Sequence, residues 1–176
     1  MPRNLTQAMG FLLGFWIALA LSPLWVTVAA ADESASLAKE LHAEVNRVRA
    51  NYHLVPLARR SDLDGVAHAH SDDMARRNYF SHHSPEGANP VHRLQKAQID
   101  DMRLAAENLG ITTEANPSLQ IVKQWLASPD HRSNLLGPAF NFTGIGITRN
   151  AGGALIFTQL YISAPRDPLR GAAPTN

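Results

Sequence analysis

The chain has 176 residues, with 16 Lys and Arg against 15 Asp and Glu, and no cysteine. A chain so close to neutral, with its charges interspersed, has no basic patch of the kind that binds nucleic acid or anionic lipid. The lack of cysteine excludes disulfides, thiol catalysis and cysteine–zinc sites, so a folded domain must be held by its own hydrophobic core.

The first 31 residues have the pattern of a secretory signal peptide. Arg3 supplies a basic start, an apolar run covers about residues 9–28, and small residues up to Ala31 precede the expected cleavage point. The alternative is an uncleaved membrane anchor, because the apolar run is just long enough to cross a bilayer. The protein would then touch a membrane only through that segment. We expect a secreted or periplasmic protein of a bacterial envelope, since small exported eukaryotic domains are usually rich in disulfides.

Cleavage after Ala31 would leave one domain and a tail. Residues 32–163 contain all the periodic segments and are of ordinary single-domain size. Residues 164–176 are rich in Pro, Gly and Ala and have little to bury, so this tail is predicted to be disordered.

The first two helices of that domain are predicted from apolar residues at helical spacing. One helix covers residues 34–52 and ends before Pro56. A second helix is expected over residues 62–77, where Ser61 and Asp64 are similar to a capping box. Its inner face is expected to hold Leu63, Ala67, His70 and Met74.

Two Asn-Pro pairs predict the starts of two further helices, because Asn is a good N-cap and Pro suits the first helical position. The helix that follows Asn89 runs to about residue 97, and the helix that follows Asn116 ends near Ser128. Between them, residues 104–111 are either a short strand or an extended loop.

The C-terminal part of the domain changes to the period of β-strands. Residues 143–149 alternate, residues 150–153 form a turn, and residues 154–162 are rich in β-formers, which together predict a hairpin. Helices packed around such strands form a single α+β domain.

Three motifs carry a family resemblance: YFSHHSPEG at 79–87, AENLG at 106–110, and WLASPDHRSNLL from 125, with TGIGI from 143. Together with LHAEVNRVRANYHLVPL and LDGVAHAHSDDM upstream, they resemble the cysteine-free bacterial branch of the CAP superfamily, also called SCP-like extracellular proteins. The resemblance covers about residues 37–162. It implies an α-β-α sandwich with a central antiparallel sheet and an open cleft.

The resemblance also assigns residues to that cleft, which family members line with two histidines and two glutamates. His82 and Glu107 match the first of each, and His131 matches the second histidine by its spacing to the following strand. The second glutamate belongs three residues after Trp125, where this chain has Ser128. The set is therefore incomplete, and Glu86 and Glu114 are the acids nearest in sequence that could replace the missing one.

Two imidazoles and a carboxylate are suited either to a metal with open positions, such as zinc or another divalent ion, or to general-base chemistry. Since Ser128 is a poor metal ligand, any metal held by His82 and His131 is expected to bind weakly. Each residue also has a purely structural interpretation: His82 as a solvated loop residue, Glu107 as an acceptor for nearby turns, and His131 as a brace for the turn after it.

Other histidine and serine patterns point to structure more than to chemistry. His68 and His70 are two residues apart on a helix and face different ways, so His70 is expected in the core or on the cleft floor. Ser128 and His131 lack the third group and the sharp turn of a serine hydrolase. Asn108 is expected to brace nearby turns, and Arg93 and Arg132 are expected to be structural ion-pair or hydrogen-bond partners.

Two function classes follow. The first is a binding module for a lipid, sterol or other small envelope component at His82, Glu107, Ser128 and His131, with no cofactor required. It is favoured because the set lacks an acid that catalysis would need. The alternative is a zinc-assisted hydrolase of peptide or cell-envelope polymer, in which the two histidines hold the ion and Glu107 activates water.

Overall fold

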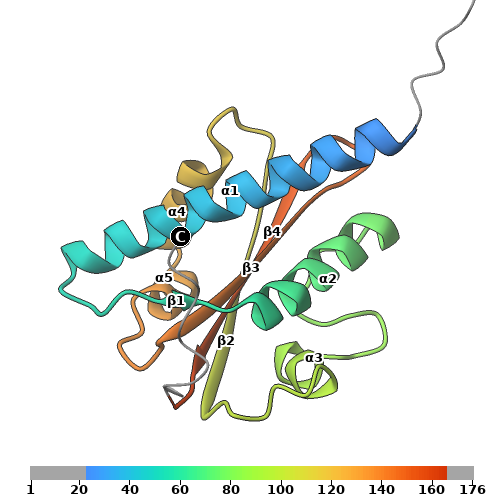
Figure 1. The fold of residues 1–176 in the computed structure, drawn as a ribbon. Coiled ribbons are helices and arrows are strands. Elements are labelled where there is room, and N and C mark those ends of the chain that lie inside the picture. The colour runs from blue at the N-terminus through green and yellow to red at the C-terminus, as the bar shows by residue number, and fades with distance from the viewer. Residues whose placement is uncertain (1–22, 166–176) are drawn as a thin grey trace, which may run out of the picture.

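The computed structural model describes residues 23–165, with side chains from residue 32 onward. Most of the expected signal peptide and the tail from residue 166 therefore lie outside the described residues. Helices and strands are mixed along the chain (Figure 1). Their order is α1 (Pro23–Asn51), β1 (Ala58–Arg59), α2 (Ser61–Arg77), α3 (Pro90–Lys96), β2 (Leu104–Thr112), α4 (Pro117–Ala127), α5 (Pro129–Leu135), β3 (Phe142–Arg149) and β4 (Leu155–Ser163).

The sheet has the order β1-β3-β4-β2 and separates two helical layers. β2, β4 and β3 are antiparallel, as expected, but β1 is parallel to β3 over two residues, so the sheet is mixed and not purely antiparallel. The exception arises because the chain leaves this edge after Arg59 to begin α2. Helices α1, α4 and α5 share one buried cluster with one face of the sheet, and α2 and α3 share another with the opposite face. The predicted α+β sandwich is confirmed.

The alternation in β3 decides how closely α2 approaches the sheet. Gly144 and Gly146 face α2, where an added Cβ at Gly146 would lie 2.1 Å from the backbone nitrogen of His68. Ile145 and Ile147 point the other way, into the cluster under α1. Because the two glycines have no side chain, the α2 backbone lies directly on the sheet, and this fixes the position of every residue on α2.

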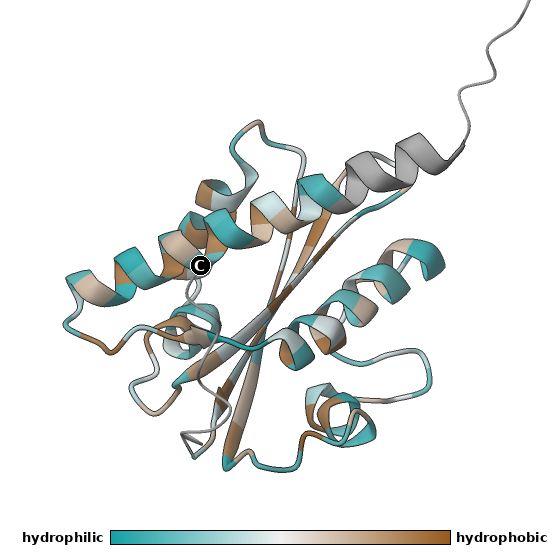
Figure 2. Ribbon diagram, in the orientation of Figure 1, coloured by the Kyte–Doolittle hydropathy of each residue, from teal (hydrophilic) through white to brown (hydrophobic). Residues whose placement is uncertain are grey.

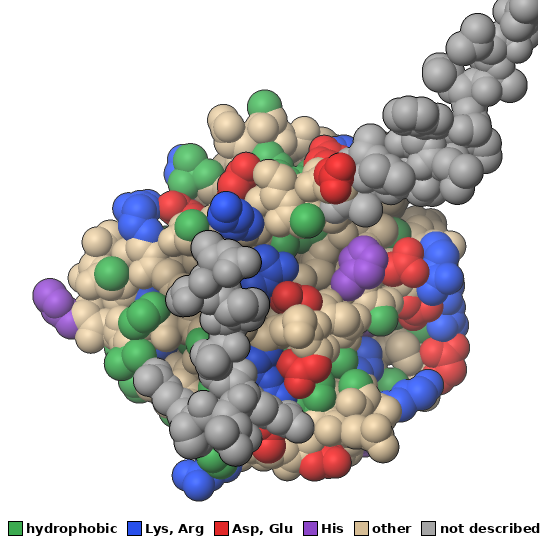
Figure 3. Space-filling model, in the orientation of Figure 1, with side chains coloured by type: hydrophobic (Ala, Val, Ile, Leu, Met, Phe, Trp, Pro, Cys, Tyr) green, Lys and Arg blue, Asp and Glu red, His purple; other side chains and the backbone are tan. Residues whose placement is uncertain are grey.

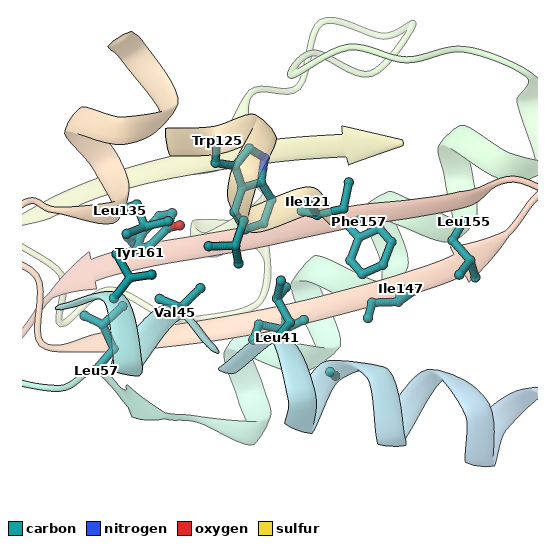
Figure 4. Close-up of a cluster of buried hydrophobic side chains, with 14 residues drawn as sticks. Leu41, Val45, Leu57, Ile121, Trp125, Leu135, Ile147, Leu155, Phe157 and Tyr161 are labelled. Atoms are coloured by element: carbon teal, nitrogen blue, oxygen red, sulfur yellow. The ribbon is translucent and has the colours of Figure 1, made fainter. Parts of the chain in front are cut away.

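The larger core lies between α1, α4 and the sheet (Figure 4). Trp125 is buried at its centre, and its indole Nε1 donates to the carbonyl of Leu109 on β2 at 2.8 Å. The apolar faces predicted for the first helix and for α4 both point into this core. Figure 2 shows the same division, with brown residues on the inner sides of the helices and teal on the outer sides.

The starts of two helices, α1 and α2, differ from the sequence-based expectations. α1 begins at Pro23, well before residue 34, since the apolar segment upstream continues the helix. The N-cap of α2 is Arg60, without a side-chain cap bond, and Ser61 is already helical, so the expected capping box is wrong. The carboxylate of Asp64 instead accepts the N–H of Ile145 at 2.8 Å, which ties α2 to β3.

The helix that follows Asn116 was predicted to end near Ser128. It does end there, but the interruption lasts for one residue only. Ser128 is extended, with φ −95° and ψ 123°, and then Pro129 begins α5. Proline is favoured at a first helical position, so the break that ends α4 also starts a new helix. His131 therefore lies in a helix and not in a turn.

The remaining boundaries agree closely with expectation. Asn89 caps α3 by accepting the N–H of His92 at 2.9 Å, whereas Asn116 makes no such bond at α4. Residues 104–112 form a strand, which settles the open alternative. Ala164 is buried and donates to Asn141, so ordered structure continues just past residue 163. Within residues 23–165, no helix combines the length and apolarity that a bilayer crossing requires.

Candidate functional site

The loop between α2 and α3, residues 78–89, is held by hydrogen bonds from one side chain of each of these helices. His70 of α2 pairs through Nε2 with the carbonyl of Ser81 at 3.0 Å. Arg93 of α3 donates through Nη1 to the carbonyls of His82 and Ala88, each at 3.0 Å. The backbone at His82 is thereby fixed from two directions, although its side chain is 46% exposed.

His82 and Glu107 form a direct pair across the edge of the sheet. His82 Nδ1 lies 2.8 Å from Glu107 Oε1, and Arg93 Nη2 lies 2.6 Å from Glu107 Oε2. The Glu107 side chain is only 1% exposed, so both oxygens of a buried carboxylate are engaged. A carboxylate only accepts, so Nδ1 of His82 carries the proton and Nε2 is the free nitrogen.

His70 forms the floor beneath this pair, as its place on the apolar face of α2 predicted. It is 2% exposed, and its Nε2 lies 4.0 Å from Glu107 Oε1. Burial lowers the pKa of His70 from its ordinary value, and the nearby Glu107 carboxylate only partly opposes this effect. His70 is therefore neutral at pH 7 and acts as a hydrogen-bonding support.

Helix α5 brings His131 to the same end of β2. Asn108 donates to the carbonyl of His131 at 2.9 Å, and Asn134 donates to the Asn108 side chain at 2.9 Å and to the Glu107 carbonyl at 3.3 Å. The His131 pKa is lowered first by burial and then by the neighbouring His82.

Ser128 does not join this cluster through its side chain. It separates α4 from α5, and in the described part of the chain its hydroxyl makes no hydrogen bond to His82, Glu107 or His131. Glu86 pairs with Arg77 on the exposed surface, and Glu114 lies exposed beyond the end of β2, so neither acid takes the place of the missing glutamate.

Arg93 is the site residue whose partner the sequence did not reveal. An ion-pair or hydrogen-bond role was predicted for it, and the partner is Glu107, the buried carboxylate of the candidate site. Its position near the middle of α3 gives no signal of this, because the pairing depends on how α3 packs beside β2.

The donor set does not suit a zinc ion in this arrangement. Catalytic zinc sites use three protein ligands, whereas here the carboxylate oxygens are already bonded and two imidazoles remain. Among the residues that the structure describes, no group of three or more His, Asp or Glu side chains converges as a metal site. A metal held by His82 and His131 therefore stays a proposal, and these two imidazoles are the ligands that support it.

Two hollows in the described part of the chain lie apart from this site. One, of about 680 Å³, lies between α1 and α2, and the other, of about 460 Å³, lies beside the start of α4. Neither of the two is lined by His82, Glu107 or His131.

Comparison with known proteins agrees with this architecture. Residues 42–161 match the family described as "CAP: Cysteine-rich secretory protein family". The chain belongs to the CAP family. The resemblance inferred from the three motifs is thus confirmed, and the CAP match includes His82, Glu107, Ser128 and His131.

Two relatives of this CAP-family chain come from Bacillus subtilis (strain 168). "Uncharacterized protein YkwD" is 31% identical over 136 residues, which cover 77% of this chain and 51% of that protein. "Uncharacterized membrane protein YlbC" is 32% identical over 124 residues, which cover 70% of this chain and 34% of that protein. The chain spans about half and one third of the lengths of these relatives.

Solved structures extend the comparison. A Bacillus anthracis extracellular protein containing an SCP domain matches with a TM-score of 0.69 at 30% identity, over 81% of this chain and 44% of that chain. An outer surface protein from Borrelia burgdorferi matches with a TM-score of 0.67 at 22% identity, over 74% of this chain and 94% of that chain. The second likeness concerns the fold alone.

Proposed function

We propose that this CAP-domain protein is exported and binds a small ligand of the cell envelope at the His82–Glu107 site, without chemistry of its own. The observation that carries the proposal is the state of Glu107. Its oxygens lie 2.8 Å from His82 Nδ1 and 2.6 Å from Arg93 Nη2, so each oxygen already accepts a hydrogen bond and the carboxylate orients a histidine. The extracellular protein from Bacillus anthracis, which is 30% identical to this chain, supports export.

The chemistry around His82 indicates what kind of ligand fits. Its free Nε2 accepts a hydrogen bond from a hydroxyl or an amide. Phe80 in the same loop is 48% exposed, and Val91 at the start of α3 is 38% exposed, so apolar surface accompanies the polar group. A molecule with one hydroxyl or amide on an apolar body, such as a sterol or a lipid with a polar head, matches both.

The proposal is tested by binding measurements on the purified protein with three probes: cholesterol, palmitate and a muropeptide. His82→Phe keeps a ring but removes both nitrogens, and His92→Phe is the matched control on the exposed side of α3. We expect at least one probe to bind, with affinity about tenfold weaker in His82→Phe, equivalent to one lost hydrogen bond, and unchanged in His92→Phe. Failure of all three probes, or equal binding by both variants, would refute the proposal.

The second candidate is a zinc-assisted hydrolase, favoured by the packing of α5, which places His131 beside Asn108, the residue that follows Glu107. This function requires the Glu107 carboxylate to give up its hydrogen bond to Arg93 or His82 and to bind a water molecule instead. Peptide and cell-wall hydrolysis is measured with and without zinc, in the unmodified protein, His82→Ala and His131→Ala. Zinc-dependent turnover that both substitutions abolish would replace the binding proposal.

A further inference from the structure

A groove of about 680 Å³ runs along β3 between residues 33–38 of α1 and the outer side of α2. Residues 145–149 of β3 form its floor. Its walls are small or polar: Ser34, Ala35 and Ala38 from α1, and Gly65, His68 and Asp72 from α2. In Figure 3, a histidine and charged side chains of both signs lie together over α2. None of these residues belongs to the His82 site.

The floor of this groove is an unpaired edge of the sheet. β1 covers β3 only at Phe142 and Thr143, and in the described part of the chain no strand pairs with the rest of that edge. The backbone N–H of Arg60 donates to the Thr143 carbonyl at 3.0 Å, and Asp64 accepts the Ile145 N–H at 2.8 Å. The backbone N–H and carbonyl groups of the odd-numbered residues of β3 therefore point toward this edge. By the two-residue period of a strand, the backbone N–H and carbonyl of Ile147 also point into the groove.

The walls leave room for another main chain. Gly65 lies in the interior of α2, where glycine is about 1 kcal/mol less favourable than alanine, and a Cβ there would meet nothing within 4 Å. No packing contact therefore requires this glycine. On the opposite wall, Ala35 and Ala38 present only methyl groups. A strand beside β3 needs about 4.8 Å of lateral space, and side chains this small do not obstruct it.

The charges of the groove favour a basic occupant. Glu33 pairs with Arg149 at 2.6 Å, and Arg59 pairs with Asp64 at 2.9 Å. The remaining lining charge is Asp72, whose partner Arg76 has a side chain 68% exposed and does not line the groove. Asp72 is therefore the lining charge whose partner lies outside the groove, and because an exposed pair of this kind is weak, its carboxylate stays available to a basic occupant.

We propose that this groove binds an extended segment of a partner polypeptide, which adds to β3 as a strand and directs a lysine or arginine toward Asp72. Main-chain hydrogen bonds to an exposed strand edge supply affinity, and alternate side chains supply specificity. About five partner residues would span the floor, roughly 16 Å at the rise of a strand. On the α1 side the partner carries small or β-branched residues, because Ala35 and Ala38 lie close to the sheet there.

The test uses a synthetic peptide, AVKVKVA with blocked ends, added to the full chain and followed by amide chemical shifts. A second peptide has the same side chains but carries N-methyl groups on the alternate amides that would face β3, and a third has glutamate for lysine. We expect the first peptide to shift the amides of Gly65 and Ile147. Both other peptides should bind at least about tenfold more weakly, the methylated one because two hydrogen bonds are lost.

Two variants at one position complete the test. Gly65→Trp fills the groove and should abolish binding, while Gly65→Ala leaves most of the space and should retain it; thermal unfolding shows that both fold. Equal binding by the methylated and unmethylated peptides overturns the proposal, as does the absence of binding at millimolar concentration. Two other occupants would also overturn it: palmitate in place of peptide, or a second copy, seen as a dimer in sedimentation that Gly65→Trp dissociates.

Discussion

Replacing Arg93 by methionine removes the guanidinium that neutralises Glu107 while keeping most of the apolar side chain. The two side chains are 13% and 1% exposed, so the carboxylate would be left charged and buried. Removing one partner of such a pair costs about 3–5 kcal/mol. Glu107 retains His82 as a second partner at 2.8 Å. We therefore expect the free energy of unfolding to fall by the lower part of that range, about 3 kcal/mol.

Urea unfolding monitored by circular dichroism measures the change, and the chain has a matched control. Arg77 pairs with Glu86, but these side chains are 40% and 65% exposed. Arg77→Met should therefore leave the free energy of unfolding almost unchanged, because exposed ion pairs contribute little. Adding Glu107→Gln to Arg93→Met should restore about 1–2 kcal/mol, because a neutral amide is cheaper to bury than an unpaired charge. If Arg93→Met is no more destabilising than Arg77→Met, the electrostatic account of the site is wrong.

Burial lowers the pKa values of His70 and His131 below 6.5, so the unfolded chain takes up more protons than the folded chain as the pH falls through 6.5. The free energy of unfolding should thus be highest above pH 6.5 and decrease below it; an unchanged pH slope in His70→Gln would contradict this. Gly146→Ala should destabilise the protein by about 3 kcal/mol or more, because its Cβ would lie 2.1 Å from the α2 backbone. Gly65→Ala should instead stabilise it by about 1 kcal/mol. Similar urea midpoints for the two variants would count against the close packing of α2. Trp125→Phe removes a buried indole donor and should cost about 2–3 kcal/mol, and a loss below about 1 kcal/mol would show that this hydrogen bond contributes little.

Much of the fold was predictable because its signals are local. The apolar face of α2, the cap at Asn89 and the β3–β4 hairpin depend on spacing within a few residues. The family motifs likewise led to His82 and Glu107, which the structure brings into contact across 25 positions. The sequence-based account failed at Ser61, where the capping pattern was met but Arg60 took the cap position, and at Pro129, where a helix break also began a helix.

Residue identity and local spacing were enough to predict the family, the order of most elements and, through the resemblance, that Ser128 stands where a second glutamate is expected. Tertiary packing was needed to show that Arg93 and His82 occupy both oxygens of Glu107, and that β3 keeps an open edge after Arg59 turns away into α2. These features depend on how α3 and α2 pack against the sheet. No spacing along the chain encodes them, because they join segments that become neighbours only when the core is formed.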